Sequence, residues 1–147
     1  MAEKSFVLTR KKALFLVLLC AAVLIFLIAL RWHKNAGIDL STMEGREMFL
    51  SELGWQIDKS TEESKTVLIP DKLSGVIADY NEMQLQQGYD LNKHLGEYCQ
   101  QFTYTVTNYS GFSGTVLVTI YVQGRNIIAG DIHAAAMDGF MHGIKKL

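Results

Sequence analysis

Four titratable side chains gather near the end of the chain, in the stretch "GDIHAAAMDGFMHGI", residues 130–144. They are Asp131, His133, Asp138 and His142. Carboxylates and imidazoles can ligate zinc, and they can exchange protons with a substrate. The spacing from His133 to Asp138 to His142 matches no familiar zinc motif, and no further acid or base stands beside it. We therefore expect no metal, no cofactor and no catalytic set, and keep these four as candidate binding residues.

Two different periodicities position this cluster. Asp131 and His133 belong to the alternating stretch "NIIAGDIH", which predicts that both lie on one side of a strand. Beyond it, apolar residues recur at helical spacing and predict a short amphipathic C-terminal helix: Met137, Phe140, Met141 and Ile144. In such a helix Asp138 and His142 would lie one turn apart and could touch.

Alternation with a period of two dominates the second half of the chain. The stretches "YCQQFTYTVTN", "TVLVTIYV" and "NIIAGDIH" are rich in β-branched and aromatic residues and predict three strands. The short links "YSGFSG" and "QGR" contain glycine, which predicts an antiparallel meander. Upstream, "GWQID" and "KTVLIP" predict two short strands around a polar loop, "KSTEES".

Two helices are expected to cover the sheet. "STMEGREMFLSELG" predicts the first, with Ser41 and Glu44 as a capping box and Gly54 at its end. The second is expected to begin at Pro70 and to end at Gly88, before an irregular helical turn in "YDLNKHLGE". The fold class is therefore α+β: a two-layer domain with a three- or four-stranded antiparallel sheet, packed by one or two helices and a short C-terminal helix.

An uncharged apolar run near the start predicts a membrane anchor. Residues 13–30 are 18 apolar residues, about 27 Å of helix at about 1.5 Å per residue. Basic residues 10–12 precede the run, which favours a cytoplasmic N-terminus. A cleaved signal peptide fits less well, because Arg31 stands where a small residue would be needed. We expect a basic cytoplasmic segment (1–12), a transmembrane helix (13–32), a linker (33–40) and an extracytoplasmic α+β domain (41–147).

The exported part is acidic. It carries 8 Lys and Arg residues against 14 Asp and Glu residues, a formal net charge of −6. Such a surface repels phosphate backbones, so nucleic acid is not an expected partner. Cys99 is the one cysteine of this part of the sequence, which rules out an internal disulfide, and we expect it to be buried.

The order of these segments resembles a known protein family. The segments are "EGREMFLSELGWQID", "VLIPDKL", "YNEMQLQQGYDLNKHLG", "YTVTNY" and "MDGFMHGI", between Glu44 and Ile144. They are similar to uncharacterised single-anchor proteins of Gram-positive anaerobic Firmicutes that carry a domain of unknown function. The resemblance implies a bacterial envelope location. It implies no activity, because that family offers no catalytic residues to carry over.

Two functional interpretations follow. The preferred one is a non-enzymatic binding or regulatory module, held in the bilayer by residues 13–32 and contacting an envelope protein or wall component. The alternative is a membrane-anchored metal-binding protein or hydrolase that uses the C-terminal cluster. The alternative requires His133, Asp138 and His142 to converge in one pocket.

Overall fold

The computed structural model describes residues 37–136 and 139–145, together with Val17, Leu19 and residues 21–23. Residues Ile38–Leu147 form a compact unit of their own. In the described part of the chain, no helix is long and apolar enough to cross a membrane. The predicted span, residues 13–32, lies mostly outside the described residues and stays a prediction.

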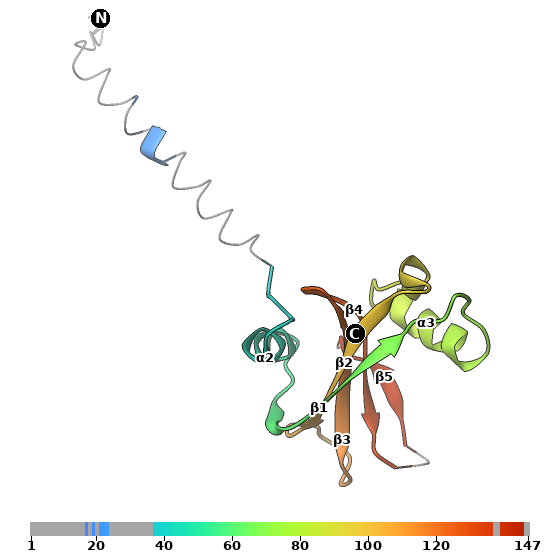
Figure 1. The fold of residues 1–147 in the computed structure, drawn as a ribbon. Helices are drawn as coiled ribbons and strands as arrows, with labels where there is room; N and C mark the ends of the chain where they lie inside the picture. Colours follow the sequence, from blue (N-terminus) through green and yellow to red (C-terminus); the bar gives the residue numbers. More distant parts are fainter. Residues whose placement is uncertain (1–16, 18, 20, 24–36, 137–138, 146–147) are drawn as a thin grey trace, which may run out of the picture. The chain divides into compact units, whose positions relative to one another are not determined.

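Five strands of the described chain form one antiparallel sheet in the order β1-β2-β3-β4-β5 (Figure 1). The strands are β1 (Ile57–Leu68), β2 (Tyr98–Val106), β3 (Val116–Gln123), β4 (Asn126–Ala134) and β5 (Met141–Gly143). The meander of β2, β3 and β4 confirms the prediction from alternating residues, although the sheet has more strands than the three or four expected. The α+β class is likewise confirmed.

The predicted polar loop "KSTEES" is wrong, because β1 runs through it as one edge strand. Its pairing with β2 shifts register between Asp58 and Glu63. Polar side chains supply the bonds that the irregular backbone misses: Thr61 Oγ1 accepts from the Thr105 amide at 2.9 Å and donates to the Asp58 carbonyl at 2.7 Å. The polar residues therefore support a β-bulge rather than a loop.

The predicted C-terminal helix is also wrong, because residues 141–143 form β5. This strand pairs with β4 through Asp131–Gly143, Ile132–His142 and His133–Met141. The edge of β4 offers unpaired backbone groups, whereas Gly139 and Gly143 weaken a helix by about 1 kcal/mol each relative to alanine. Phe140, His142 and Ile144 share the face toward the larger core, so the period here is two.

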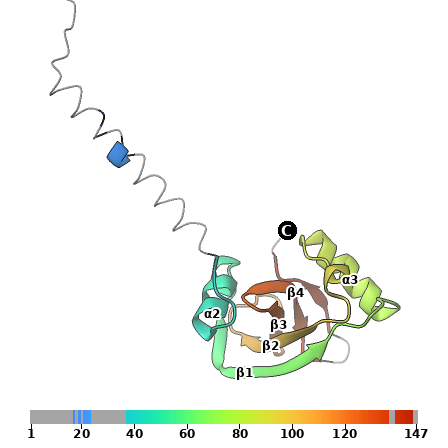
Figure 2. The ribbon, with the colours of Figure 1, turned by 45° about the horizontal axis from the view of Figure 1, so that its top comes forward.

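Each face of the sheet has its own hydrophobic core, and Figure 2 shows the sheet between two helices. The larger core joins α2 (Met43–Glu52) to alternate residues of the strands: Leu50, Trp55, Tyr104, Val118, Ile120, Ile132 and Ile144 are among its members. The smaller core lies under α3 (Val76–Gln86) and the 3-10 helix η1 (Leu91–His94), and includes Ile69, Leu91, Cys99, Ile128 and Ala129. The predicted burial of Cys99 is confirmed.

The start of α2 differs from the predicted capping box. Thr42 is the N-cap, since its Oγ1 accepts from the Gly45 amide at 3.1 Å. Ser41 instead donates to Asp39 Oδ1 at 2.6 Å, within a turn that precedes the helix. Gly54, at φ 84°, follows the helix as predicted.

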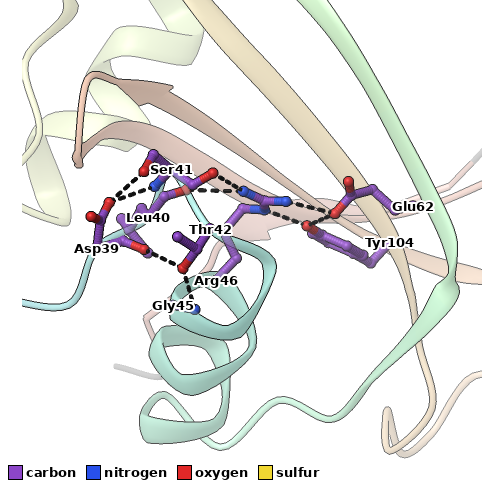
Figure 3. Close-up of polar contacts among 8 residues, drawn as sticks. All are labelled: Asp39, Leu40, Ser41, Thr42, Gly45, Arg46, Glu62 and Tyr104. Carbon is purple, nitrogen blue, oxygen red and sulfur yellow. Dashed lines mark hydrogen bonds and ion pairs between the residues drawn. The ribbon is translucent and has the colours of Figure 1, made fainter.

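A buried cation joins α2 to the sheet (Figure 3). Arg46 is 3% exposed; its guanidinium lies 2.8 Å from Glu62 on β1 and donates to the Tyr104 hydroxyl on β2 at 2.6 Å. It also donates to the carbonyls of Leu40 and Ser41. Burial raises the pKa of Glu62, but hydrogen bonds from Tyr104 and Arg46 outweigh it and lower the pKa overall. All these partners are satisfied within the domain, which marks the cluster as structural.

The second helix begins at Val76 rather than at Pro70. Ile69 is held in an extended conformation, because its amide donates to the Glu97 carbonyl at 2.9 Å and its carbonyl accepts from the Gly96 amide at 3.0 Å. The chain turns into α3 only after Gly75, whose φ of 55° is a left-handed value. Gly88 follows the end of the helix, as predicted.

Two glutamines dock α3 onto the sheet edge. Gln84 Oε1 accepts from the Gly130 amide at 2.9 Å, and Gln87 Nε2 donates to the Gly130 carbonyl at 3.1 Å. Gly130 lies on β4 just beyond the residues that pair with β5. The two side chains therefore take the place of a strand at this position, which fixes the helix over one face of the sheet.

Candidate ligand-binding pocket

A pocket of about 750 Å³ lies between α3 and one face of the sheet, and we call it the α3 pocket. Its walls are mostly apolar and its floor is polar. The lining comprises Lys65, Val67, Leu68, Ile69, Val76, Ile77, Asp79, Tyr80, Met83, Leu91, Gln101, Thr103, Thr119, Tyr121, Asp131, His133 and Met141. Its volume and mixed lining are typical of sites for small molecules.

The strand register builds the polar floor. Thr103 on β2 lies opposite Thr119 on β3, and Thr119 lies opposite Asp131 on β4. Side chains of alternate residues share a face, so His133 follows Asp131 on the same side of β4. The two threonine hydroxyls are 2.9 Å apart and hydrogen-bond each other. One row of the sheet thus carries polar side chains beneath apolar walls.

Asp131 is a buried carboxylate at the centre of this floor, only 2% exposed. The Tyr80 hydroxyl of α3 donates to its Oδ1 at 2.7 Å. The imidazole Nδ1 of His133 lies 2.7 Å from its Oδ2. Each oxygen therefore has a partner, which offsets the cost of burying the group.

His133 is a polar group of the floor that a ligand can reach, with its side chain 25% exposed. The hydrogen bond to Asp131 raises the pKa of this imidazole, against an opposing effect of burial. Because Asp131 accepts at Nδ1, that nitrogen carries a proton, and Nε2 is the atom left for a ligand. No described residue hydrogen-bonds Nε2.

The tyrosines of the pocket are held in their neutral form. Burial, with the nearby Asp131 charge, raises the pKa of Tyr80 far above its ordinary value. Burial and Asp131 raise the pKa of Tyr121 to about 12. The Tyr80 hydroxyl is thereby kept as a hydrogen-bond donor to Asp131 at any ordinary pH.

The structure brings together two of the four predicted site residues and separates a third. Asp131 and His133 face the α3 pocket, whereas His142 lies on the opposite face of the sheet. There His142 Nε2 is 3.0 Å from the Tyr109 hydroxyl, and its ring stacks with Phe140. Asp138 lies outside the described residues. Among residues 37–136 and 139–145, no group of three or more His, Cys, Asp or Glu side chains is placed to hold a metal ion.

Tyr80, Thr103 and Thr119 are site residues that the sequence analysis missed. The helical spacing of Tyr80 with Val76 and Ile77 is typical of a buried stripe, so the sequence pattern favours a core position for Tyr80. Its partnership with Asp131 joins residues 51 positions apart and depends on where α3 crosses the sheet. The threonines carried a usable signal, since each alternates with core residues and so shares the opposite face.

Comparisons with known proteins gave no relatives. No protein-family model matches the chain, and no match was found among curated proteins or solved structures. The chemistry of the α3 pocket is therefore the basis for assigning a function.

Proposed function

We propose that this protein is a membrane-anchored, non-enzymatic binding module of the bacterial cell envelope, and that the α3 pocket is its binding site. The observation that carries the proposal is a roomy, apolar-walled pocket with a reachable imidazole on its floor. Pockets with few, well-placed polar groups among apolar walls are suited to bind a ligand in one orientation.

The rim of the pocket supports binding rather than simple packing. Leu68, Val76 and Met141 line the pocket and are exposed, although each is apolar. These residues come from β1, α3 and β5, so three separate elements contribute exposed apolar surface to the pocket. Apolar surface that gathers at a concave site is favourable to cover and marks an interaction surface.

The sequence supports the proposed location. Residues 13–30 are apolar and uncharged, and basic residues 10–12 favour a cytoplasmic N-terminus. The resemblance to single-anchor envelope proteins points the same way. In this arrangement the anchor holds the domain near the outer surface of the membrane, where ligands of the envelope are concentrated.

One observation favours a second candidate, a hydrolase. Asp131 orients His133 as a carboxylate orients a general base, which leaves Nε2 without a hydrogen-bond partner among the described residues. Of the other two predicted members, His142 lies on the opposite face of the sheet and Asp138 lies outside the described residues. The binding function is preferred because the neighbouring hydroxyls, those of Thr103 and Thr119, hydrogen-bond each other. Neither hydroxyl is hydrogen-bonded to His133, as a nucleophile activated by this imidazole would be.

One sample can test both candidates. The full chain, labelled at its methionine methyl groups and held in phospholipid nanodiscs, would be mixed with a small-molecule extract of bacterial envelopes. We expect NMR shifts at Met83 and Met141, which line the pocket, and none at Met43 and Met48 on α2. The resonances of the ligand should stay unchanged overnight.

Two results would overturn this assignment. Unchanged Met83 and Met141 signals with every extract fraction would remove the binding function. Conversion of the ligand to a product, stopped by His133→Gln, would establish the hydrolase instead.

A further inference from the structure

We infer that the ligand of the α3 pocket is an amphipathic carboxylate, with its carboxylate on His133 Nε2 and its apolar body against α3. This inference rests on the proposed binding function and specifies the chemistry of the ligand. It follows from which polar atoms of the floor are already used and which are left to a ligand.

The acceptor groups of the floor are occupied. Both oxygens of Asp131 accept hydrogen bonds, from Tyr80 and from His133, and the carboxylate is almost fully buried. An ammonium group in the pocket would therefore find no accessible carboxylate at the floor. A cationic head is therefore disfavoured at the floor, and the carboxylate that it could reach is Asp79, an exposed lining residue on α3.

Beside Asp131, the group of the floor that remains for a ligand is His133 Nε2. When His133 is protonated, Nε2 presents an N–H, and Asp131 stabilises that form through Nδ1. A charge-assisted hydrogen bond from an imidazolium to a carboxylate is stronger than a bond between neutral groups. The carboxylate is thus the head group that gains most from this imidazole.

A second donor lies two strands away. Thr119 is buried and Thr103 is half-buried, and their hydroxyls share one hydrogen bond. If the buried Thr119 donates to Thr103, no buried proton is left without a partner, and the Thr103 proton faces the pocket. Gln101 also donates to Thr103 Oγ1, at 3.4 Å. Thr103 is too far along the sheet for the same carboxylate, so it suits a further acceptor on the ligand.

The apolar body has a matching surface. Ile77 and Met83 of α3 line the pocket wall, Val76 lies exposed at its rim, and Met141 lies directly opposite His133 on β5. A chain attached to a carboxylate at His133 therefore meets methyl and methylene groups as it leaves the floor. Each buried methylene contributes about 0.8 kcal/mol, so an alkyl or leucine-like body adds affinity.

The charge state of His133 makes binding dependent on pH. Five other titratable side chains line the pocket: Lys65, Asp79, Tyr80, Tyr121 and Asp131. His133 is the imidazole among them, and imidazoles change charge near neutral pH. Affinity for a carboxylate should fall as pH rises through the pKa of His133, because Nε2 then offers a lone pair instead of a proton.

A series of matched probes tests this inference. Octanoate, octan-1-ol and octylammonium share one chain and differ in the head group. N-acetyl-leucyl-leucine and its C-terminal amide make the same comparison for a peptide-like source. Each would be titrated into the full chain in nanodiscs, with the methyl signals of Met83 and Met141 as the readout and empty nanodiscs as the partition control.

We expect octanoate to bind about tenfold or more tightly than octan-1-ol at pH 6, and the dipeptide acid to exceed its amide similarly. The preference should vanish at pH 9 in the unmodified chain and in His133→Gln at pH 6. His142→Gln, on the opposite face of the sheet, is the matched control and should keep the preference for the acid. If only one acid shows the preference, it identifies the lipid-like or the peptide-like source.

The outcomes separate the two proposals. Equal binding of the three octyl probes, or tightest binding of octylammonium, would overturn the carboxylate inference and leave the pocket as a binding site. Failure of every probe to shift Met83 or Met141 would overturn the binding function as well.

Discussion

The imidazole Nδ1 of His133 lies 2.7 Å from Oδ2 of Asp131, two residues earlier on the same strand. Residues two apart on a strand share a face, so β4 itself sets this pair. Asp131 is in turn fixed by the Tyr80 hydroxyl. The pair therefore places a defined imidazole tautomer at the floor of the α3 pocket.

Asp131→Asn should lower the pKa of His133, because the carboxylate that stabilises the imidazolium is lost. The folded-state pKa of His133 is raised, so the pair stabilises the fold below the unfolded pKa of about 6.5. That contribution disappears as pH rises through the folded pKa. The loss of stability in Asp131→Asn should thus be greater at pH 6 than at pH 8.

An NMR titration of the imidazole signals in the full chain measures this effect. Asp79→Asn, which changes another carboxylate of the pocket lining, is the control and should leave the His133 titration unchanged. An unaltered His133 pKa in Asp131→Asn would show that the hydrogen bond does not hold in solution.

Gln84→Met should open the edge of β4 at Gly130. The substitution removes the acceptor of the Gly130 amide proton, and exchange of that proton should accelerate about tenfold or more. Hydrogen exchange is a sharper readout than overall stability. Among the described residues the buried Gln84 Nε2 has no hydrogen-bond partner, so methionine also removes the cost of burying that group, which offsets part of the lost stability. Gln86→Met, at an exposed position of the same helix, should not change the exchange of Gly130. Equal exchange in both variants would refute the docking role of Gln84.

The fold and the site were predictable from the sequence to different extents. The strands β2, β3 and β4 were predicted because their residues alternate between two faces with a period of two, and threonines hold the second face in β2 and β3. The C-terminal segment was not, because Met137, Phe140, Met141 and Ile144 fit a helix while the open edge of β4 selects a strand. Local propensity could not decide between the two, since the deciding partner is another strand.

The same distinction holds for the site. Asp131 and His133 were found together because two residues on one strand suffice to predict a shared face. Tyr80 was not found, because its contact depends on the position of α3 over the sheet. The separation of His142 from His133 follows from β5, the strand that forms where a helix was predicted. His133 lies opposite Met141, and the next residue of β5, His142, points to the other face of the sheet.

Gly45→Ala should destabilise the fold, although alanine is the better helix former by about 1 kcal/mol. A Cβ at Gly45 would lie 1.8 Å from the backbone oxygen of Asp39, so the first turn of α2 must shift. We expect a Tm lower by about 8 °C or more, equivalent to about 2 kcal/mol. Gly37→Ala is the control, because a Cβ there meets nothing within 4 Å. Equal Tm values for the two variants in thermal unfolding would contradict this.

The proposed topology predicts labelling from outside the cell. Met48→Cys places a thiol at an exposed position of α2, whereas the native Cys99 is buried. A membrane-impermeant maleimide should label Met48→Cys in intact bacteria and leave the unmodified chain unlabelled. Lys4→Cys, in the expected cytoplasmic segment, should react only after lysis. Labelling of Lys4→Cys in intact cells would reverse the orientation.

Photo-crosslinking in living bacteria tests most directly whether the α3 pocket is the binding site. Met141 on the pocket rim and Met48 on α2 are 54% and 55% exposed, so they form a matched pair for a benzoylphenylalanine substitution. We predict a covalent adduct of reproducible mass at position 141 and none at position 48. The same adducts at both positions, or no adduct at either, would contradict the assignment of the pocket.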